Sequence, residues 1–201
     1  AMTVGQTPVM VSLHATKIAG IGEGGLLLTQ NKTLIAAMRS CIHFGFQGER
    51  FSQRVGINAK ASEYHAAVGL AMLDGWQDTR QAWHKVQQRY RDRFSAAGIR
   101  YFPHTDSVSS VFNVILPQAA LNSAVALRER GIDTRRWWEA GCHAHPAYRA
   151  YQTKALPVTQ WLGESVLGIP MAMDLSPDNQ DAVCYAVIQI AMQLAKTKEY
   201  A

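Results

Sequence analysis

Short apolar runs open the chain and predict two strands separated by a loop. Residues 8–13 and residues 25–29 are brief, mostly apolar runs of the length that buried strands have. The segment between them holds Lys17 and a cluster of glycines. This pattern places Lys17 on a loop between two strands.

Apolar residues at helical spacing predict three helices after the second strand. The first covers residues 33–42, and the second begins at Ser62, a suitable N-cap, and runs to about residue 74. A long third helix ends near Gly98, a typical C-terminal cap. Its large apolar residues form a stripe expected to pack in a core or between domains: Trp76, Trp83, Val86, Tyr90 and Phe94.

The pattern changes after Gly98 and predicts a smaller α+β domain. Residues 99–102 and 111–116 have the character of strands, and a helix is expected over 119–130, ended by Gly131. Ser176 is the expected N-cap of a closing amphipathic helix. We therefore predict two domains, residues 1–95 and residues 96–201.

Composition favours a globular, cytoplasmic protein. The 201 residues are 48% hydrophobic, and no apolar run approaches the roughly 20 residues of a membrane span. The first residues have neither the basic nor the apolar region of a signal peptide. Three cysteines without a CxxC pair are expected to be buried free thiols. The sequence therefore predicts no membrane association.

The basic character of the chain leaves a nucleic-acid partner open as a minor alternative. The formal net charge is +5, and Arg89, Arg91 and Arg93 cluster on one predicted helix. The other face of that helix is apolar, so a solvated face explains the cluster. Steep salt dependence of binding would be the signature of the alternative.

Two motif-like segments are not expected to be sites. Residues 20–25 match GxGxxG, but a dinucleotide site needs a helix to follow, and a strand is predicted there. The glycines instead permit a tight turn beside a bound group. His143 and His145 lack further ligands at suitable spacing, so we expect no metal site.

Residues 12–17 (SLHATK) and 22–25 (GEGG) closely resemble the Schiff-base segment of the DegT/DnrJ/StrS family of sugar aminotransferases. The resemblance continues through residues 56–63 (GINAKASE) and 143–148 (HAHPAY). Residues 132–138 resemble a strand of the family's small domain. Essentially the whole chain is covered.

The resemblance implies a fold class and an activity. The fold would be α/β, a partial type I (aspartate aminotransferase-like) fold with the end of the large domain and a small C-terminal domain. The cofactor would be pyridoxal 5'-phosphate (PLP). The reaction would transfer an amino group from an amino acid, expected to be glutamate, to a keto sugar on a nucleotide, for example in lipopolysaccharide or O-antigen biosynthesis. A homodimer is expected.

The resemblance also assigns roles to individual residues. Lys17 would hold PLP as a Schiff base, Ser12 would donate to its phosphate, and Asn58 would reach the phosphate in the neighbouring subunit. The structural alternatives are a strand-end hydroxyl for Ser12 and a turn residue for Asn58. The possible contacts with substrate or cofactor, each with a structural or solvated alternative, are His14, Arg50, Arg54 and Arg135.

A lysine suits this chemistry on general grounds. Its amine forms an imine with an aldehyde, and its pKa falls readily when a site desolvates it. Once an incoming amine displaces it, the same lysine can act as general base and acid at the substrate carbon. Lys17 is therefore the candidate catalytic residue.

Family members are about twice as long as this chain, and their lysine lies near the middle rather than at residue 17. We therefore expect this chain to correspond to the C-terminal half and to be inactive by itself, because the phosphate cradle and the acid at the ring nitrogen lie in the other half. One alternative is an inactive remnant that acts only by association with a partner chain. A related sugar dehydratase is disfavoured because it would have histidine in place of Lys17.

Overall fold

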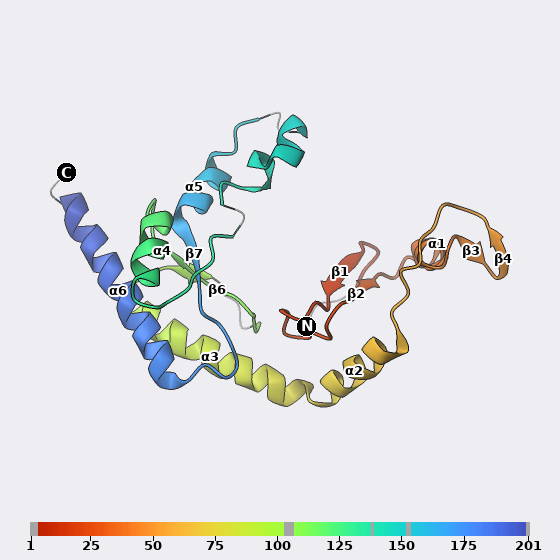
Figure 1. Cartoon of the computed structure of the whole chain (residues 1–201), viewed down its shortest axis with the longest axis horizontal. Helices are drawn as coiled ribbons and strands as arrows, with labels where there is room; N and C mark the ends of the chain where they lie inside the picture. The colour runs from red at the N-terminus through yellow and green to blue at the C-terminus, as the bar shows by residue number, and fades with distance from the viewer. Residues whose placement is uncertain (1–3, 103–106, 138, 152–153, 200–201) are drawn as a thin grey trace. The chain divides into compact units, whose positions relative to one another are not determined.

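The fold is described from a computed structural model that covers residues 4–102, 107–137, 139–151 and 154–199 (Figure 1). The chain forms two compact units, residues 1–77 and residues 78–201. The predicted division into functional domains at residue 96 is a different boundary and stays a prediction.

The first unit begins with the two predicted strands. β1 (Val9–Ser12) pairs antiparallel with β2 (Gly25–Leu28), with Ser12 opposite Gly25. α1 (Lys32–Ile42) follows directly, and its N-cap Asn31 accepts a hydrogen bond from the Leu34 amide at 2.9 Å. The strand–loop–strand arrangement around Lys17 is therefore confirmed.

A small hairpin follows α1 that the hydrophobic pattern did not predict. β3 (Phe46–Gln47) pairs antiparallel with β4 (Glu49–Ser52) around Gly48, which has a φ of +89°. Every residue of β4 is exposed. Because no face of β4 is buried, its sequence carries no alternation of apolar and polar residues.

α2 (Glu63–Asp74) is the last helix of the first unit, and Ser62 is its N-cap as predicted. None of its residues is fully buried. Tyr64, Leu70 and Leu73 are 76%, 65% and 60% exposed. An exposed apolar surface of this kind is typical of a site of contact with another polypeptide.

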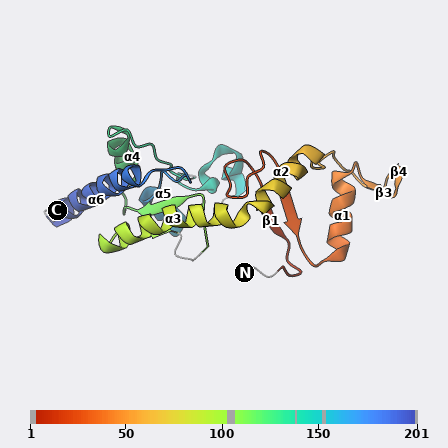
Figure 2. The ribbon, with the colours of Figure 1, turned by 90° about the horizontal axis from the view of Figure 1, so that it is seen from below.

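The second unit is built on a three-stranded antiparallel sheet in the order β5 (Tyr101–Phe102), β6 (Phe112–Ile115), β7 (Val166–Ile169). Four helices surround it: α3 (Trp76–Ala96), which begins just before the unit, α4 (Ala120–Arg128), α5 (Pro157–Ser165) and α6 (Pro177–Glu199). Figures 1 and 2 show α3 and α6 side by side. Short 3-10 turns, Cys142–Ala144 and Pro146–Tyr151, precede α5.

An aromatic cluster fills the core of the second unit. Phe112 on β6 is fully buried, and its ring centre lies 5.2 Å from Tyr90, 5.9 Å from Phe94 and 5.2 Å from Tyr101. Tyr90 donates its hydroxyl to the Pro170 carbonyl at 2.8 Å. Val86, Tyr90 and Phe94 of the predicted stripe on α3 thus pack in this core.

Three details of the second unit correct the sequence-based expectations. Residues 132–137 form no strand and pair only through a bridge between Arg135 and Gly168, while Trp138 lies outside the described residues. α5 and β7 were not predicted. All three cysteines are free as expected, but only Cys184 is buried, because Cys142 is exposed and Cys41, in the first unit, is half-buried.

The arginine cluster on α3 is engaged within the protein. Arg89 and Arg93 both donate to the Asp181 carboxylate on α6, at 2.6 Å and 3.0 Å. The hydrogen bond from Arg89 is the main reason that the pKa of Asp181 is lowered, and the hydrogen bond from Arg93 contributes in the same direction. Two of the three clustered arginines therefore join α3 to α6 through Asp181.

Replacing Phe112 by alanine is expected to destabilise the second unit by about 3–5 kcal/mol, because a buried ring is lost and the surrounding rings cannot fill the cavity. Urea denaturation followed by circular dichroism measures the change. Leu121→Ala, on the exposed face of α4, is the control and is expected to change stability by less than about 0.5 kcal/mol. Equal effects of the two substitutions would contradict the assigned core.

Candidate active site

The loop that carries Lys17 extends the β1–β2 hairpin. Beyond the strands, the Leu13 amide donates to the Gly24 carbonyl at 3.0 Å, and the Ala15 amide donates to the Gly22 carbonyl at 2.7 Å. At the tip, the Lys17 amide donates to the His14 carbonyl at 2.9 Å. Lys17 therefore stands on a hydrogen-bonded turn.

Close packing of backbone closes this turn. The Gly20 amide donates to the Lys17 carbonyl at 3.0 Å, and a Cβ atom at residue 20 would lie 2.7 Å from the Ala15 carbonyl oxygen. Gly22 has a φ of +102°, which disfavours residues with a side chain. The glycines serve the tight turn that the sequence predicted, and the strand β2 follows them in place of a dinucleotide-binding helix.

Residues of α2 pack against the loop that carries Lys17. Ile21 is 8% exposed, and a Cβ atom at Gly69 of α2 would be 3.8 Å from its Cγ2 atom. The ring of His65 lies beside Gly22, and its Nδ1 atom is 2.8 Å from the Ser62 hydroxyl. The sequence did not single out His65. In the sequence, Val68 and Met72 follow His65 at helical spacing, which places His65 on the same face of α2 as these apolar residues.

His14 is tied into the loop by hydrogen bonds that the sequence did not predict. The Thr16 amide donates to His14 Nδ1 at 3.2 Å, and the Thr16 hydroxyl lies 3.0 Å from the same nitrogen. His14 Nε2 lies 3.6 Å from a carboxylate oxygen of Glu23. These contacts support the structural alternative for His14, because they join residues on the two sides of the loop.

Ser12 and Lys17 present free polar groups at the surface. The His14 amide donates to the Ser12 hydroxyl oxygen at 3.4 Å, which leaves the hydroxyl hydrogen available for an anion. The Lys17 side chain is exposed, and within the described residues it makes no hydrogen bond or ion pair. Both groups are chemically suited to a phosphorylated aldehyde such as PLP.

Asn58 lies in the first unit, in the segment between β4 and α2. Its backbone forms an antiparallel bridge with His43, and its Oδ1 atom accepts a hydrogen bond from Lys60 at 2.6 Å. Within the described residues, no hydrogen bond joins Asn58 to Lys17 or Ser12. The hydrogen bond from Lys60 to Asn58 was not predicted, although Lys60 lies only two residues after Asn58 in the sequence.

The predicted arginines are exposed and lie in different units. Arg50 is on β4 and Arg54 follows it, both in the first unit. Arg135 is in the second unit, where its backbone exchanges hydrogen bonds with Gly168 at 2.9 Å and 2.7 Å. Within the described residues of the first unit, no hydrogen bond or ion pair joins Arg50 or Arg54 to Lys17.

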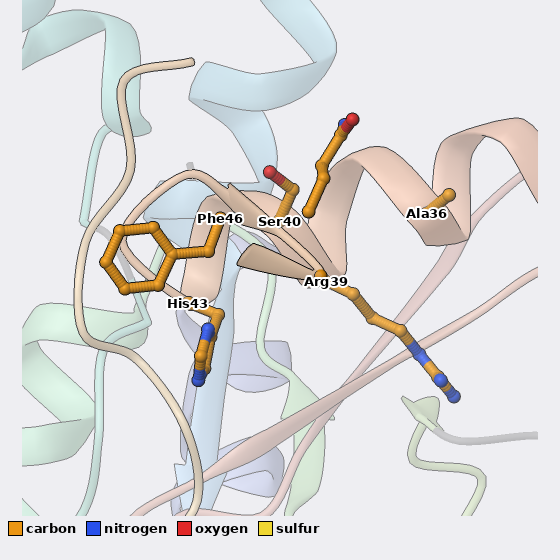
Figure 3. A pocket seen from close by; sticks show the side chains of 7 residues that line it. Ala36, Arg39, Ser40, His43 and Phe46 are labelled. Carbon is orange, nitrogen blue, oxygen red and sulfur yellow. The ribbon is translucent and has the colours of Figure 1, made fainter. Parts of the chain in front are cut away.

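A cavity of about 460 Å³ lies between the end of α1 and the β3–β4 hairpin (Figure 3). Arg39, Ser40, His43 and Phe46 line it, and none of the predicted site residues does. The Ser40 hydroxyl is buried without a partner, but Figure 3 shows Arg39 and Ser40 pointing away from each other. The side chains do not converge on one ligand position.

Neither a metal centre nor a membrane span is found in the part of the chain that the structure describes. In residues 4–102, 107–137, 139–151 and 154–199, no three His, Cys, Asp or Glu side chains are grouped so as to hold a metal ion. Within the same ranges, no helix has the length and apolar content to cross a membrane.

Comparison with known proteins identifies the family. Residues 3–188 match the DegT/DnrJ/EryC1/StrS aminotransferase family. Protein Rv3402c of Mycobacterium tuberculosis is 29% identical over 183 residues, which are 88% of this chain and 44% of that protein. The chain belongs to the DegT/DnrJ/EryC1/StrS aminotransferase family.

Solved structures agree in fold. DesI, solved in the presence of its TDP-sugar product, is 27% identical with a TM-score of 0.81, and the match covers 96% of this chain and 52% of DesI. A family member from Brucella abortus has a TM-score of 0.80 at 23% identity, covering 92% of this chain and 51% of that one. The fold is therefore a partial PLP-aminotransferase fold, and the chain spans about half the length of the relatives it matches.

Replacing Gly20 by alanine is expected to open the Lys17 turn, because the new Cβ atom would press on the Ala15 carbonyl. The amide protons of Lys17 and Ile21 should then exchange with solvent about tenfold faster or more, corresponding to about 1.4 kcal/mol. Hydrogen exchange followed by NMR measures this rate. Gly5→Ala is the matched control, since no atom lies within 4 Å of its added Cβ. Unchanged exchange in Gly20→Ala would show that the turn does not depend on this approach.

Proposed function

We propose that this chain provides the lysine-bearing half of a PLP-dependent aminotransferase that moves an amino group from an amino acid to a nucleotide-linked keto sugar. The supporting observation is the exposed Lys17 on a turn fixed by the Ala15–Gly22 and Lys17–His14 hydrogen bonds. Family membership supports amino transfer, and the relative DesI has a TDP-sugar as its product.

Lys17 has two tasks in this proposal. Its amine attaches the cofactor, and after an amino donor displaces it, Nζ takes a proton from the substrate carbon and returns one later. PLP, when bound, withdraws electrons from that carbon. The fixed turn restricts the backbone from which the lysine side chain extends, which lowers the entropic cost of bringing Nζ to the reacting atoms.

Phosphate recognition is assigned to neutral donors. The Ser12 hydroxyl, whose oxygen already accepts from the His14 amide, donates its hydrogen to the cofactor phosphate. Asn58 donates its amide to the phosphate held by the neighbouring subunit of a homodimer. Arg50, Arg54 and Arg135 are candidates for a nucleotide diphosphate, since guanidinium groups pair with phosphate oxygens.

Glutamate is the proposed amino donor, and a cell-surface polysaccharide such as O-antigen is the proposed destination of the sugar. A cytoplasmic location fits these substrates. The alternative of an inactive remnant that acts by association is favoured by one observation, the exposed apolar surface of α2. The two functions differ in whether Lys17 reacts with PLP.

Titration of the chain with PLP is expected to produce a lysine-dependent absorbance band between about 330 and 430 nm. Lys17→Arg is expected to abolish the band, because it keeps the charge but replaces the amine with a guanidinium group that does not form the imine. Absorbance spectroscopy gives the result directly.

The matched control is Lys32→Arg on the exposed surface of α1, which is expected to leave the band unchanged. A band of equal strength in Lys17→Arg would exclude Lys17 as the attachment point. Absence of any band in the unmodified chain would favour the remnant that acts by association.

Self-association is expected to cover the exposed part of α2. Changing Leu70 and Leu73 together to glutamate should weaken the dimer by about tenfold or more, because two apolar contacts become charged. Sedimentation velocity over a concentration series measures the dissociation constant. Leu121→Glu, on α4 of the second unit, is the control with a similarly exposed leucine. A wild-type chain that is monomeric at every concentration would refute the homodimer.

A further inference from the structure

We propose that Lys60 is a positioning residue that fixes the orientation of the Asn58 amide, so that Asn58 presents two N–H donors to a phosphate group. The inference rests on the proposed phosphate-binding role of Asn58. It adds a residue that acts through Asn58.

The chemistry of the two side chains fixes the orientation of the amide. Lys60 Nζ lies 2.6 Å from Asn58 Oδ1, and an ammonium group can only donate hydrogen bonds. The flipped amide would place the NH₂ group of Asn58 against three ammonium hydrogens, which is repulsive. Lys60 therefore selects the orientation in which the carbonyl oxygen faces the lysine and Nδ2 faces away.

That orientation is the one a phosphate requires. Phosphate oxygens accept hydrogen bonds, so they bind Nδ2 and are repelled by Oδ1. Without Lys60, the amide of Asn58 can rotate to present its carbonyl oxygen to the anion. The ammonium of Lys60 also leaves positive charge beside the donor, which favours an anionic ligand.

Lys60 is itself held in place by an aromatic ring. Its Nζ atom lies 4.6 Å from the centre of the Phe44 ring, the geometry of a cation–π contact. Phe44 has a φ of +58°, a conformation that is unfavourable for a large side chain. Such a conformation persists only where surrounding contacts enforce it.

Those surrounding contacts also fix Asn58. The Phe44 amide donates to the Ile57 carbonyl at 3.1 Å, and the adjacent His43 bridges to Asn58. The Ser52 hydroxyl donates to the Phe44 carbonyl at 2.7 Å. The ring beneath Lys60 and the backbone of Asn58 therefore belong to one hydrogen-bonded segment, and Lys60 joins their side chains.

The experiment follows the side-chain amide of Asn58 by NMR in chain labelled with ¹⁵N-asparagine, with Asn58→Asp to assign the signal. Lys60→Met removes the charge but keeps an unbranched stem, and is expected to shift the Asn58 NH₂ signals towards those of a free amide. Lys60→Arg, another donor-only cation, is expected to restore them. Phe44→Leu tests the same positioning without changing Lys60 and is expected to give a partial shift.

Inorganic phosphate, PLP and uridine diphosphate are then titrated separately. Phosphate is expected to move the Asn58 signals in the wild type, with an affinity about tenfold weaker in Lys60→Met and recovered in Lys60→Arg. A response to PLP at lower concentration than to uridine diphosphate would identify the cofactor as the phosphate source. The reverse order would identify the nucleotide.

The titrations distinguish failure of the positioning role of Lys60 from failure of the phosphate-binding role of Asn58. If phosphate moves the Asn58 signals equally in the wild type and in Lys60→Met, the positioning role of Lys60 is wrong and the proposed role of Asn58 stands. If phosphate leaves Asn58 unmoved in the wild type, the phosphate role of Asn58 fails and this inference falls with it. The test of Lys17 with PLP is independent of both results.

Discussion

The antiparallel pairing of β1 with β2 is the constraint on which the candidate site depends. The pairing continues beyond the strands through the hydrogen bonds from Leu13 to Gly24 and from Ala15 to Gly22, so the loop has little freedom at its base. Lys17 stands at the closed end of this ladder. A lysine that must both hold a cofactor and transfer protons needs its backbone fixed, because misplacement of the amine by even one ångström is costly in rate.

The two units differ in how completely they bury their apolar residues. The second unit surrounds Phe112 with aromatic rings and closes α3 against α6 through Asp181. In the first unit, α2 leaves Leu70 and Leu73 exposed although it supports the Lys17 loop on its other face. The relatives are about twice as long as the region that matches this chain.

The segment around Phe44 shows a second way of fixing a candidate site residue. Here a residue in an unfavourable backbone conformation is held by pairing with the segment that carries Asn58, and a lysine bridges the two side chains. A ladder of backbone hydrogen bonds holds the backbone of Lys17, whereas the side chain of Asn58 contacts Lys60, which lies over the Phe44 ring. Both devices favour one conformation before a ligand binds, which reduces the entropy lost on binding.

The sequence by itself determined the elements with strong local signals, and it singled out Lys17 as the candidate catalytic residue. The apolar runs gave β1 and β2, Ser62 marked the start of α2, and the SLHATK and GEGG segments identified the family of the chain. The β3–β4 hairpin escaped prediction because none of β4 is buried, and the expected strand after residue 132 is reduced to one bridge with β7. Only the tertiary structure decided that Glu23 faces His14, that Lys60 holds Asn58, and that two arginines of α3 bind Asp181. Those contacts depend on side-chain directions and on segments distant in sequence, and the periodicity of a single chain does not encode either.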